Sequence, residues 1–194
     1  MERWVLLRKG ADFEAIGKKY QISPRLACLI RNRDVIGEEA VDRYLNGTIS
    51  DLYDGMLMKD MDKAIDILKE KILEDKKIRV IGDYDIDGVN ATYILLEGLE
   101  RLGADVDSDI PDRISDGYGL NRHLVERAYE AGVDTLITCD NGIAAADEIA
   151  YGKEMGMTVI VTDHHEVPFD EHDGEKRYRI PPADAVMDPK QPDC

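Results

Sequence analysis

The sequence has few cysteines and no long apolar run. Its three cysteines, Cys28, Cys139 and Cys194, are odd in number, lie far apart and form no CxxC pair, which argues against a disulfide framework and a cysteine-based zinc site. No apolar stretch approaches the roughly 20 residues that span a bilayer, and residues 1–4 lead into no signal peptide. We therefore expect a cytoplasmic protein that does not associate with membranes.

The sequence also has fewer basic than acidic residues. The 25 lysines and arginines face 41 acidic residues, a net charge of -16, whereas proteins that grip nucleic acid phosphates usually carry a basic patch. The composition therefore argues against tight DNA binding by this chain alone, and much of the charge fits a solvated surface. With 194 residues, 43% of them hydrophobic, the chain can bury the core of one domain with an appendage.

Strand and helix patterns alternate in the second part of the chain. Strands are predicted at 78–81, 104–110, 133–139 and 157–162, and helices at 89–102, 121–131 and 143–155. This alternation predicts an α/β fold with a mostly parallel sheet flanked by helices. No GxGxxG follows the first strand, which argues against a nucleotide-binding Rossmann protein.

Residues 1–76 are predicted to form a small helical N-terminal region before the α/β domain at 77–194. Ser23-Pro24 is a helix start, a further helix runs from Gly37 to near Gly47, and Asp60 is placed to cap a long helix through Lys77. The apolar stripe of that helix is predicted to pack against the sheet; it consists of Ala64, Ile65, Leu68, Ile72 and Leu73. The polar stretch between Val167 and Pro182 is predicted to be a surface loop.

Three clusters of potential metal ligands each follow a predicted strand: Gly82-Asp83-Tyr84-Asp85-Ile86-Asp87-Gly88, Asp140-Asn141-Gly142-Ile143 and Asp163-His164-His165. The carboxyl ends of parallel strands lie along one edge of a sheet, where such folds place their working sites. The clusters are therefore expected to meet.

The first cluster carries its carboxylates at alternate positions. If the strand persists, Asp83, Asp85 and Asp87 point the same way about 6.6 Å apart, and a divalent cation would compensate their charge. A solvated acidic turn is the alternative, as is an N-cap for Asp140. Carboxylates with imidazole suit Mn²⁺ or Mg²⁺ better than thiolate-type zinc chemistry, although zinc and cobalt stay open.

The chain resembles the amino-terminal part of RecJ-type single-stranded-DNA-specific exonucleases, in the DHH phosphoesterase superfamily. Besides the three clusters, the matching motifs are Pro111-Asp112-Arg113, Gly117-Tyr118-Gly119-Leu120 and Pro189-Lys190-Gln191-Pro192. The resemblance implies a manganese- or magnesium-dependent enzyme with two ions that releases mononucleotides from the 5′ end of single-stranded DNA. It also implies a role in DNA repair and recombination, with single-stranded-DNA-binding protein or a helicase as partner.

The resemblance also implies roles for the metal ligands. Asp85 and Asp87 would bind different ions, and Asp140 would bridge both. His164 would bind the second ion, and Asp83 is a further ligand of the first.

Three more residues receive roles from the same resemblance. His165 would contact the scissile phosphate, and Asp163 would orient the histidines rather than bind metal. Arg113 is a candidate phosphate contact, with a solvated loop arginine as the alternative.

The chain departs from the family in two respects. Asp188 stands before Pro189 where the family commonly has asparagine, which leaves the role of position 188 open. RecJ-type enzymes also carry a further metal-binding aspartate and additional domains downstream. We therefore expect a truncated DHH domain that holds single-stranded DNA weakly and has little activity alone.

Two other classes of function compete with the exonuclease. An oligoribonucleotide or cyclic-dinucleotide phosphodiesterase, or a pyrophosphatase, could use the same metal ligands, although the GDYDIDG and GYGL motifs favour the exonuclease. A non-catalytic, replication-associated binding module could keep the fold without catalysis. The intact acidic and histidine motifs argue against such a module.

Overall fold

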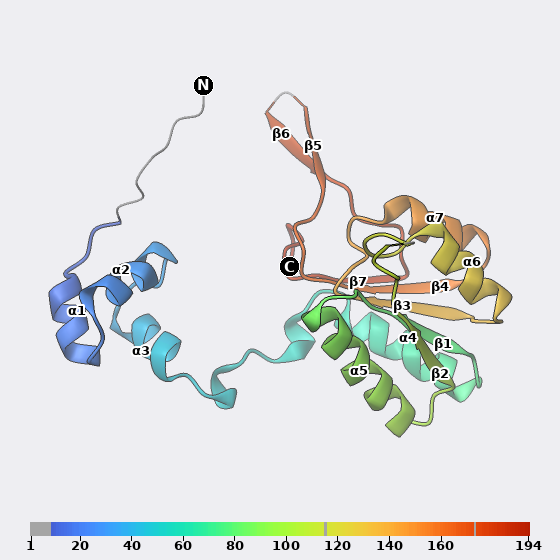
Figure 1. Ribbon diagram of the computed structural model, residues 1–194, viewed down its shortest axis with the longest axis horizontal. Helices are drawn as coiled ribbons and strands as arrows, with labels where there is room; N and C mark the ends of the chain where they lie inside the picture. The colour runs from blue at the N-terminus through green and yellow to red at the C-terminus, as the bar shows by residue number, and fades with distance from the viewer. Residues whose placement is uncertain (1–8, 115, 173) are drawn as a thin grey trace. The chain divides into compact units, whose positions relative to one another are not determined.

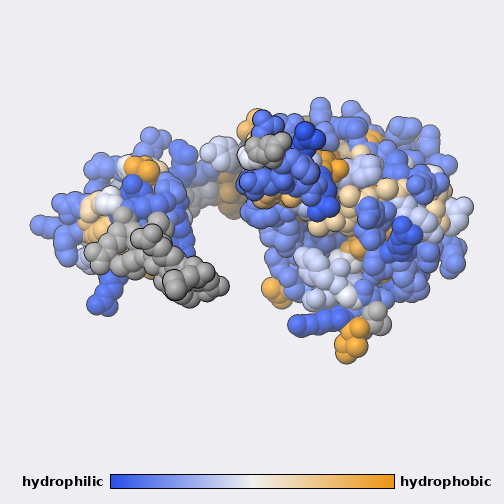
Figure 2. All heavy atoms as spheres, turned by 90° about the horizontal axis from the view of Figure 1, so that it is seen from above, coloured by the Kyte–Doolittle hydropathy of each residue, from blue (hydrophilic) through white to orange (hydrophobic). Residues whose placement is uncertain are grey.

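The computed structural model describes residues 9–114, 116–172 and 174–194. Its contacts divide the chain into two compact units, Met1–Tyr53 and Asp54–Cys194. Hydrophilic residues cover most of the face shown in Figure 2, in keeping with the net charge of -16. Among the described residues, no helix is both long and apolar enough to cross a membrane.

The first unit contains three short helices within its described residues: α1 (Phe13–Tyr20), α2 (Pro24–Asn32) and α3 (Glu38–Asn46). The predicted start at Ser23-Pro24 is confirmed, because the Ser23 hydroxyl accepts the Leu26 N–H and Pro24 occupies the first turn. Helix α3 ends just before Gly47, as expected. Two 3₁₀ turns, η1 (Ile49–Asp51) and η2 (Gly55–Leu57), follow along the chain.

The second unit is built on a parallel five-stranded sheet in the order β2-β1-β3-β4-β7 (Figure 1). The strands are β1 (Ile78–Ile81), β2 (Val106–Asp109), β3 (Thr135–Cys139), β4 (Thr158–Thr162) and β7 (Ala185–Met187). The helices are α4 (Met61–Leu73), α5 (Ile86–Arg101), α6 (Arg122–Glu130) and α7 (Ala146–Glu154). This arrangement confirms the predicted α/β fold with helices flanking a mostly parallel sheet.

Alternate strand residues enter two separate cores, one on each face of the sheet. The core under α6 and α7 includes Ile81, Leu136, Val159, Val161 and Val186 with Leu124, Val125 and Ile149 of the helices. The core under α4 and α5 includes Ile78, Val80, Ile137, Ile160 and Ala185 with Ala64 and Leu99 of the helices. Burial of both faces explains why these strands are continuous apolar runs in the sequence.

Helix α4 packs on the sheet as predicted, with two differences in detail. It ends at Leu73 rather than Lys77, and Leu73 itself is exposed. Asp60 is the N-cap residue of α4, as predicted, but its backbone is left-handed and its carboxylate accepts the Val186 N–H of β7 instead of an N–H of the helix. This contact ties the start of α4 to the edge of the sheet. The domain boundary at residues 76 and 77 stays a prediction.

Three strands near the C-terminus were not predicted. Strand β7 is short and pairs with β4 in parallel, so its extended form depends on a partner distant in sequence. The polar stretch expected to be a loop contains an exposed antiparallel hairpin, β5 (Phe169–His172) and β6 (Glu175–Tyr178). The surface location was correct, but the loop assignment was wrong.

Candidate metal centre

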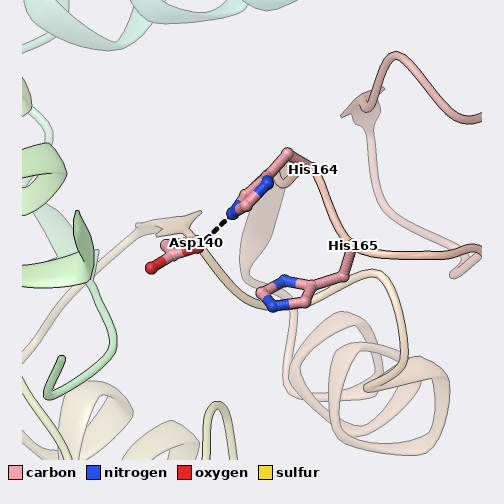
Figure 3. A group of neighbouring side chains, drawn as sticks. All are labelled: Asp140, His164 and His165. Atoms are coloured by element: carbon pink, nitrogen blue, oxygen red, sulfur yellow. Dashed lines mark hydrogen bonds and ion pairs between the residues drawn. The ribbon is translucent and has the colours of Figure 1, made fainter. Parts of the chain in front are cut away.

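The three ligand clusters meet at the carboxyl edge of the sheet. They follow β1, β3 and β4, which are neighbours in the sheet order. Figure 3 shows the His164 ring pointing toward Asp140, with Nε2 at 2.7 Å from the Asp140 Oδ1 atom. Asp87 lies at the edge of this group, with its Oδ2 atom 4.0 Å from the same Nε2. The predicted meeting of the clusters is therefore confirmed.

The prediction that a strand continues through the first cluster was wrong. Strand β1 ends at Ile81, so Asp83, Asp85 and Asp87 do not share one face of a strand. Asp85 is instead the N-cap of α5, and its carboxylate accepts the Gly88 N–H at 3.1 Å. This capping bond stabilises the first turn of α5, so a helix begins here in place of a continued strand. It also lowers the pKa of Asp85, since the N–H stabilises the charged form.

Two groups of ligand atoms nevertheless come together around Asp140. One group is Asp83, Asp85 and Asp140, and the other is Asp140, His164 and His165; within each group the ligand atoms lie within 4.8 Å of one another. Asp140 belongs to both groups.

Asp83 is the member of the cluster that most needs a cation. Its side chain is fully buried, and neither carboxylate oxygen has a hydrogen-bond partner among the described residues. An ionised carboxylate buried without a partner is costly. A divalent cation at this position would supply the missing compensation, so the residues present fit a metal.

Asp140 adopts a left-handed backbone, with φ of 60°, directly after β3. Its N–H donates to the Thr162 carbonyl of β4. Helix α7 begins only at Ala146, so the alternative of an N-cap role for Asp140 is wrong. Burial raises the pKa of the Asp140 carboxyl, an effect that the hydrogen bond from His164 partly offsets.

Asp163 uses its carboxylate to hold the loop that follows β4. Oδ1 accepts the His164 N–H, the His165 N–H and the Nδ1–H of His165, and Oδ2 accepts the Ile143 N–H. With these four bonds, few lone pairs remain for a metal. The bond from His165 raises the pKa of that imidazole, because the carboxylate stabilises its protonated form. The geometry supports the predicted orienting role of Asp163.

Arg113 is exposed and belongs to neither ligand group. Its guanidinium carbon lies over the Tyr84 ring, 5.5 Å from the ring centroid, which is a cation–π distance. A phosphate contact by Arg113 stays a prediction.

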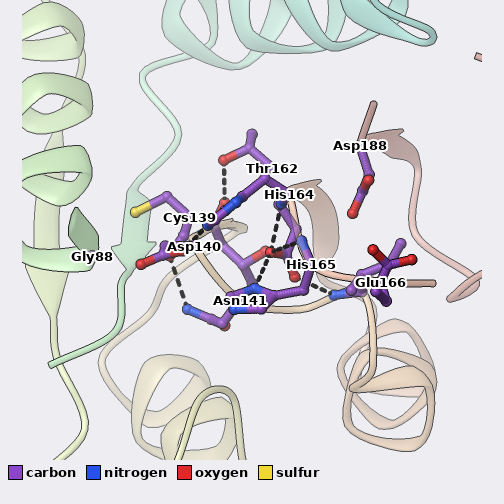
Figure 4. Close-up of polar contacts among 12 residues, drawn as sticks. Gly88, Cys139, Asp140, Asn141, Thr162, His164, His165, Glu166 and Asp188 are labelled. Carbon is purple, nitrogen blue, oxygen red and sulfur yellow. Dashed lines mark hydrogen bonds and ion pairs between the residues drawn. The ribbon is translucent and has the colours of Figure 1, made fainter. Parts of the chain in front are cut away.

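Two further residues belong to the site, although neither was assigned a role from the sequence. The Asn141 amide donates to the Ile81 and Cys139 carbonyls, so it joins the ends of β1 and β3 (Figure 4). The Tyr118 hydroxyl lies 3.2 Å from Nε2 of His165. Both residues stand in motifs that were noted in the sequence, but their hydrogen bonds depend on loops brought together by the sheet.

Asp188, the residue whose role the sequence left open, is fully buried beyond β7. Its Oδ1 accepts the Lys190 N–H, while Oδ2 has no hydrogen-bond partner among the described residues. Burial raises its pKa.

Gly88 should tolerate no side chain, because a Cβ atom there would lie 2.6 Å from the Asp83 carbonyl oxygen and 2.9 Å from the Asp83 Cα. We expect Gly88→Ala to destabilise the protein by about 1–3 kcal/mol and to displace Asp83. Gly98 in the same helix is the control, since a Cβ there would meet nothing within 4 Å. Gly98→Ala should stabilise by about 0.5–1 kcal/mol. Urea unfolding of both variants would measure this difference, and equal effects would contradict the packing argument.

Comparison with known proteins gives one consistent result. Residues 77–194 match the model of the DHH family, N-terminal domain. The single-stranded-DNA-specific exonuclease RecJ of Bacillus subtilis is 38% identical, over 99% of this chain and 23% of that protein. The Escherichia coli RecJ is 30% identical, over 100% of this chain and 32% of that protein.

Solved structures agree with the sequence comparisons. A crystal structure of exonuclease RecJ bound to manganese is 38% identical and matches 71% of this chain and 33% of that chain, with a TM-score of 0.60. RecJ from Thermus thermophilus in complex with Mn²⁺ is 30% identical and matches 98% of this chain and 26% of that chain, with a TM-score of 0.62. This chain thus spans between 23% and 33% of the length of these relatives. It belongs to the DHH family, and the relatives described above are RecJ exonucleases.

Proposed function

We propose that this chain carries the two-metal site of a phosphodiesterase that removes mononucleotides from the 5′ end of single-stranded DNA, in DNA repair and recombination. The observation that carries the proposal is the place of Asp140 in two ligand groups at one edge of the sheet. Relatives named as single-stranded-DNA-specific exonucleases, and RecJ structures that contain manganese, support this substrate and this metal.

Each ion would have its own ligands, with Asp140 common to both. Asp83 and Asp85 would complete the first set, and Asp87 and His164 the second. A set of carboxylates with one imidazole suits Mn²⁺ or Mg²⁺. Two bound cations would lower the pKa of a water molecule between them and stabilise the phosphate oxygens in the transition state.

His165 is the residue that we assign to the scissile phosphate. Asp163 holds its Nδ1 atom, so a substrate phosphate would meet the ring at Nε2, the nitrogen that lies 3.2 Å from the Tyr118 hydroxyl. Because the pKa of His165 is raised, a larger share of this imidazole carries a positive charge that attracts phosphate. Arg113 would add a second positive charge near the loop that carries Asp83 and Asp85.

Turnover is proposed to need more than this chain supplies. A net charge of -16 disfavours a strong hold on DNA, and the relatives extend well beyond the matched part. We propose that a further metal-binding aspartate and the DNA-gripping surface come from that remaining length.

A chimera tests the proposal directly. This chain would replace the matching N-terminal part of the Bacillus subtilis RecJ, to which it is 38% identical. With Mn²⁺, the chimera should release mononucleotides from 5′-labelled single-stranded oligonucleotides, whereas residues 1–194 alone should show little turnover. The measurement is product length over time with 5′-labelled and 3′-labelled substrates.

Other outcomes of this experiment would overturn the proposal. A folded chimera that binds manganese but cleaves no DNA would favour a non-catalytic binding module. Preference for cyclic dinucleotides, short oligoribonucleotides or pyrophosphate would indicate another DHH phosphoesterase.

A further inference from the structure

The imidazole of His165 is held at both of its nitrogens. Nδ1 lies 2.7 Å from Oδ1 of Asp163, and Nε2 lies 3.2 Å from the Tyr118 hydroxyl. A carboxylate can only accept, so Nδ1 carries the hydrogen of that bond. In the neutral ring Nε2 is then a bare acceptor, and the Tyr118 O–H donates to it. The two partners together select one tautomer.

Tyr118 is itself held by ring contacts on two sides. Its ring stands edge-on to the His165 ring and to the Tyr84 ring, in both cases with centroids 6.2 Å apart and planes 86° apart. Such edge-to-face pairs are favourable. On the far side of this pair, the guanidinium carbon of Arg113 lies 5.5 Å from the centroid of the Tyr84 ring. The side chains therefore contact one another in a row, in the order Arg113, Tyr84, Tyr118 and His165.

The backbone also fixes the place of Tyr118. Gly117 and Gly119 on either side of it have φ of 81° and 68°, values that favour glycine. At Gly119 a Cβ atom would lie 3.4 Å from the Asn141 Cβ, so the loop approaches the segment after β3 closely. The hydroxyl therefore reaches His165 from a turn that glycine makes possible.

The hydroxyl is suited to donate. Partial burial and the nearby charges of Asp83 and Asp140 raise the pKa of Tyr118 to about 12. The phenol consequently keeps its proton at neutral pH, and it adds no negative charge beside a phosphate site.

We propose that Tyr118 is a positioning residue for His165: its hydroxyl fixes the tautomer and ring plane of the imidazole from the side opposite Asp163, and Tyr84 with Arg113 holds Tyr118 in place. The inference rests on the proposed function, because the orientation of the imidazole affects catalysis only if His165 contacts the scissile phosphate. Tyr84 of the GDYDIDG motif and Tyr118 of the GYGL motif would then both help to hold His165 in place, without contacting a metal. Because its ring plane is already set, the imidazole needs little reorganisation when a phosphate oxygen takes the place of the Tyr118 hydroxyl at Nε2.

The test compares two tyrosines, of which only Tyr118 has its hydroxyl within hydrogen-bond distance of His165. Tyr118→Phe keeps the ring and its edge contacts but removes the hydroxyl, whereas Tyr84→Phe removes a hydroxyl for which the described residues offer no hydrogen bond. Nitrogen-15 NMR of histidine side chains in residues 1–194, without metal and at a pH where the imidazole is neutral, reads the tautomer of His165. We expect the Nε2 signal of His165 to move in Tyr118→Phe and to stay in Tyr84→Phe, with His164 as internal reference.

A His165 spectrum that is the same in Tyr118→Phe and the original protein would overturn the inference. A third variant, Tyr84→Leu, removes the ring on which Tyr118 and Arg113 rest, and it should move the His165 signal partway. Thermal melting of each variant separates loss of the bond from loss of the fold. Because the spectrum needs neither metal nor turnover, an inactive chimera would overturn the proposed function without deciding the role of Tyr118.

Discussion

Manganese binding should be lost when Asp140→Asn and His164→Ala are combined. Asp140 belongs to both ligand groups, and His164 supplies an imidazole at 2.7 Å from it. In the proposed two-metal assignment, the double variant removes a shared carboxylate charge and one neutral nitrogen ligand, so each of the two ions would lose a contact. We expect affinity to fall by at least about 100-fold, since loss of supporting partners alone costs roughly 10- to 100-fold. Isothermal calorimetry with MnCl₂ measures the change.

The same titration has a pH dependence with a definite sign. Protons compete with metal for the imidazole nitrogen and for carboxylates. The pKa of Asp140 is raised by burial, so its carboxylate takes up a proton at a higher pH than an ordinary aspartate. Binding by the original protein should therefore weaken as the pH falls, with protons released as metal binds.

The matched control is a second aspartate and histidine pair on the exposed β5–β6 hairpin. Asp170→Asn with His172→Ala makes the same two chemical changes outside both ligand groups, and it should leave manganese affinity unchanged. Equal binding by the Asp140 and His164 double variant and the original protein would refute the ligand assignment. Unfolding curves for both double variants guard against loss of structure.

The central strands of the sheet could be predicted because they are buried on both faces. Residues 78–81, 135–139 and 158–162 are short apolar runs between helices, and that pattern is typical of parallel strands. Strand β7 could not be found in the same way. Ala185–Met187 is only three residues long, and its extended form comes from pairing with β4.

The sequence predicted that the ligand motifs gather at one edge of the sheet, but it did not predict how the chain brings them there. Asp83 and Asp85 reach the site because β1 stops at Ile81 and Asp85 starts a helix, not because a strand continues. Capping and extension compete at such a position, and the structure shows the capped form, with Gly88 packed closely against Asp83. The contact of Tyr118 with His165 spans 47 residues, a separation at which the sequence gives no distance.

The His165→Ala variant of the chimera should lose turnover by a factor on the order of 10² to 10³, the usual cost of removing one transition-state contact. Its manganese affinity should stay close to that of the parent chimera, because the role assigned to His165 is contact with phosphate. His172→Ala in the exposed hairpin is the control and should keep full activity. Rates under single-turnover conditions, with saturating 5′-labelled substrate, report the chemical step.

Measuring the manganese affinity of the same variant distinguishes a phosphate contact by His165 from a metal-ligand role. His165 also lies within 4.8 Å of Asp140 and His164 ligand atoms, so it could itself be a metal ligand. In that case His165→Ala would lose manganese together with activity, and added metal would partly restore the rate. Lost activity with metal affinity retained would instead place His165 on the substrate, because removing an imidazole that touches only phosphate leaves the ions and their carboxylates as they were.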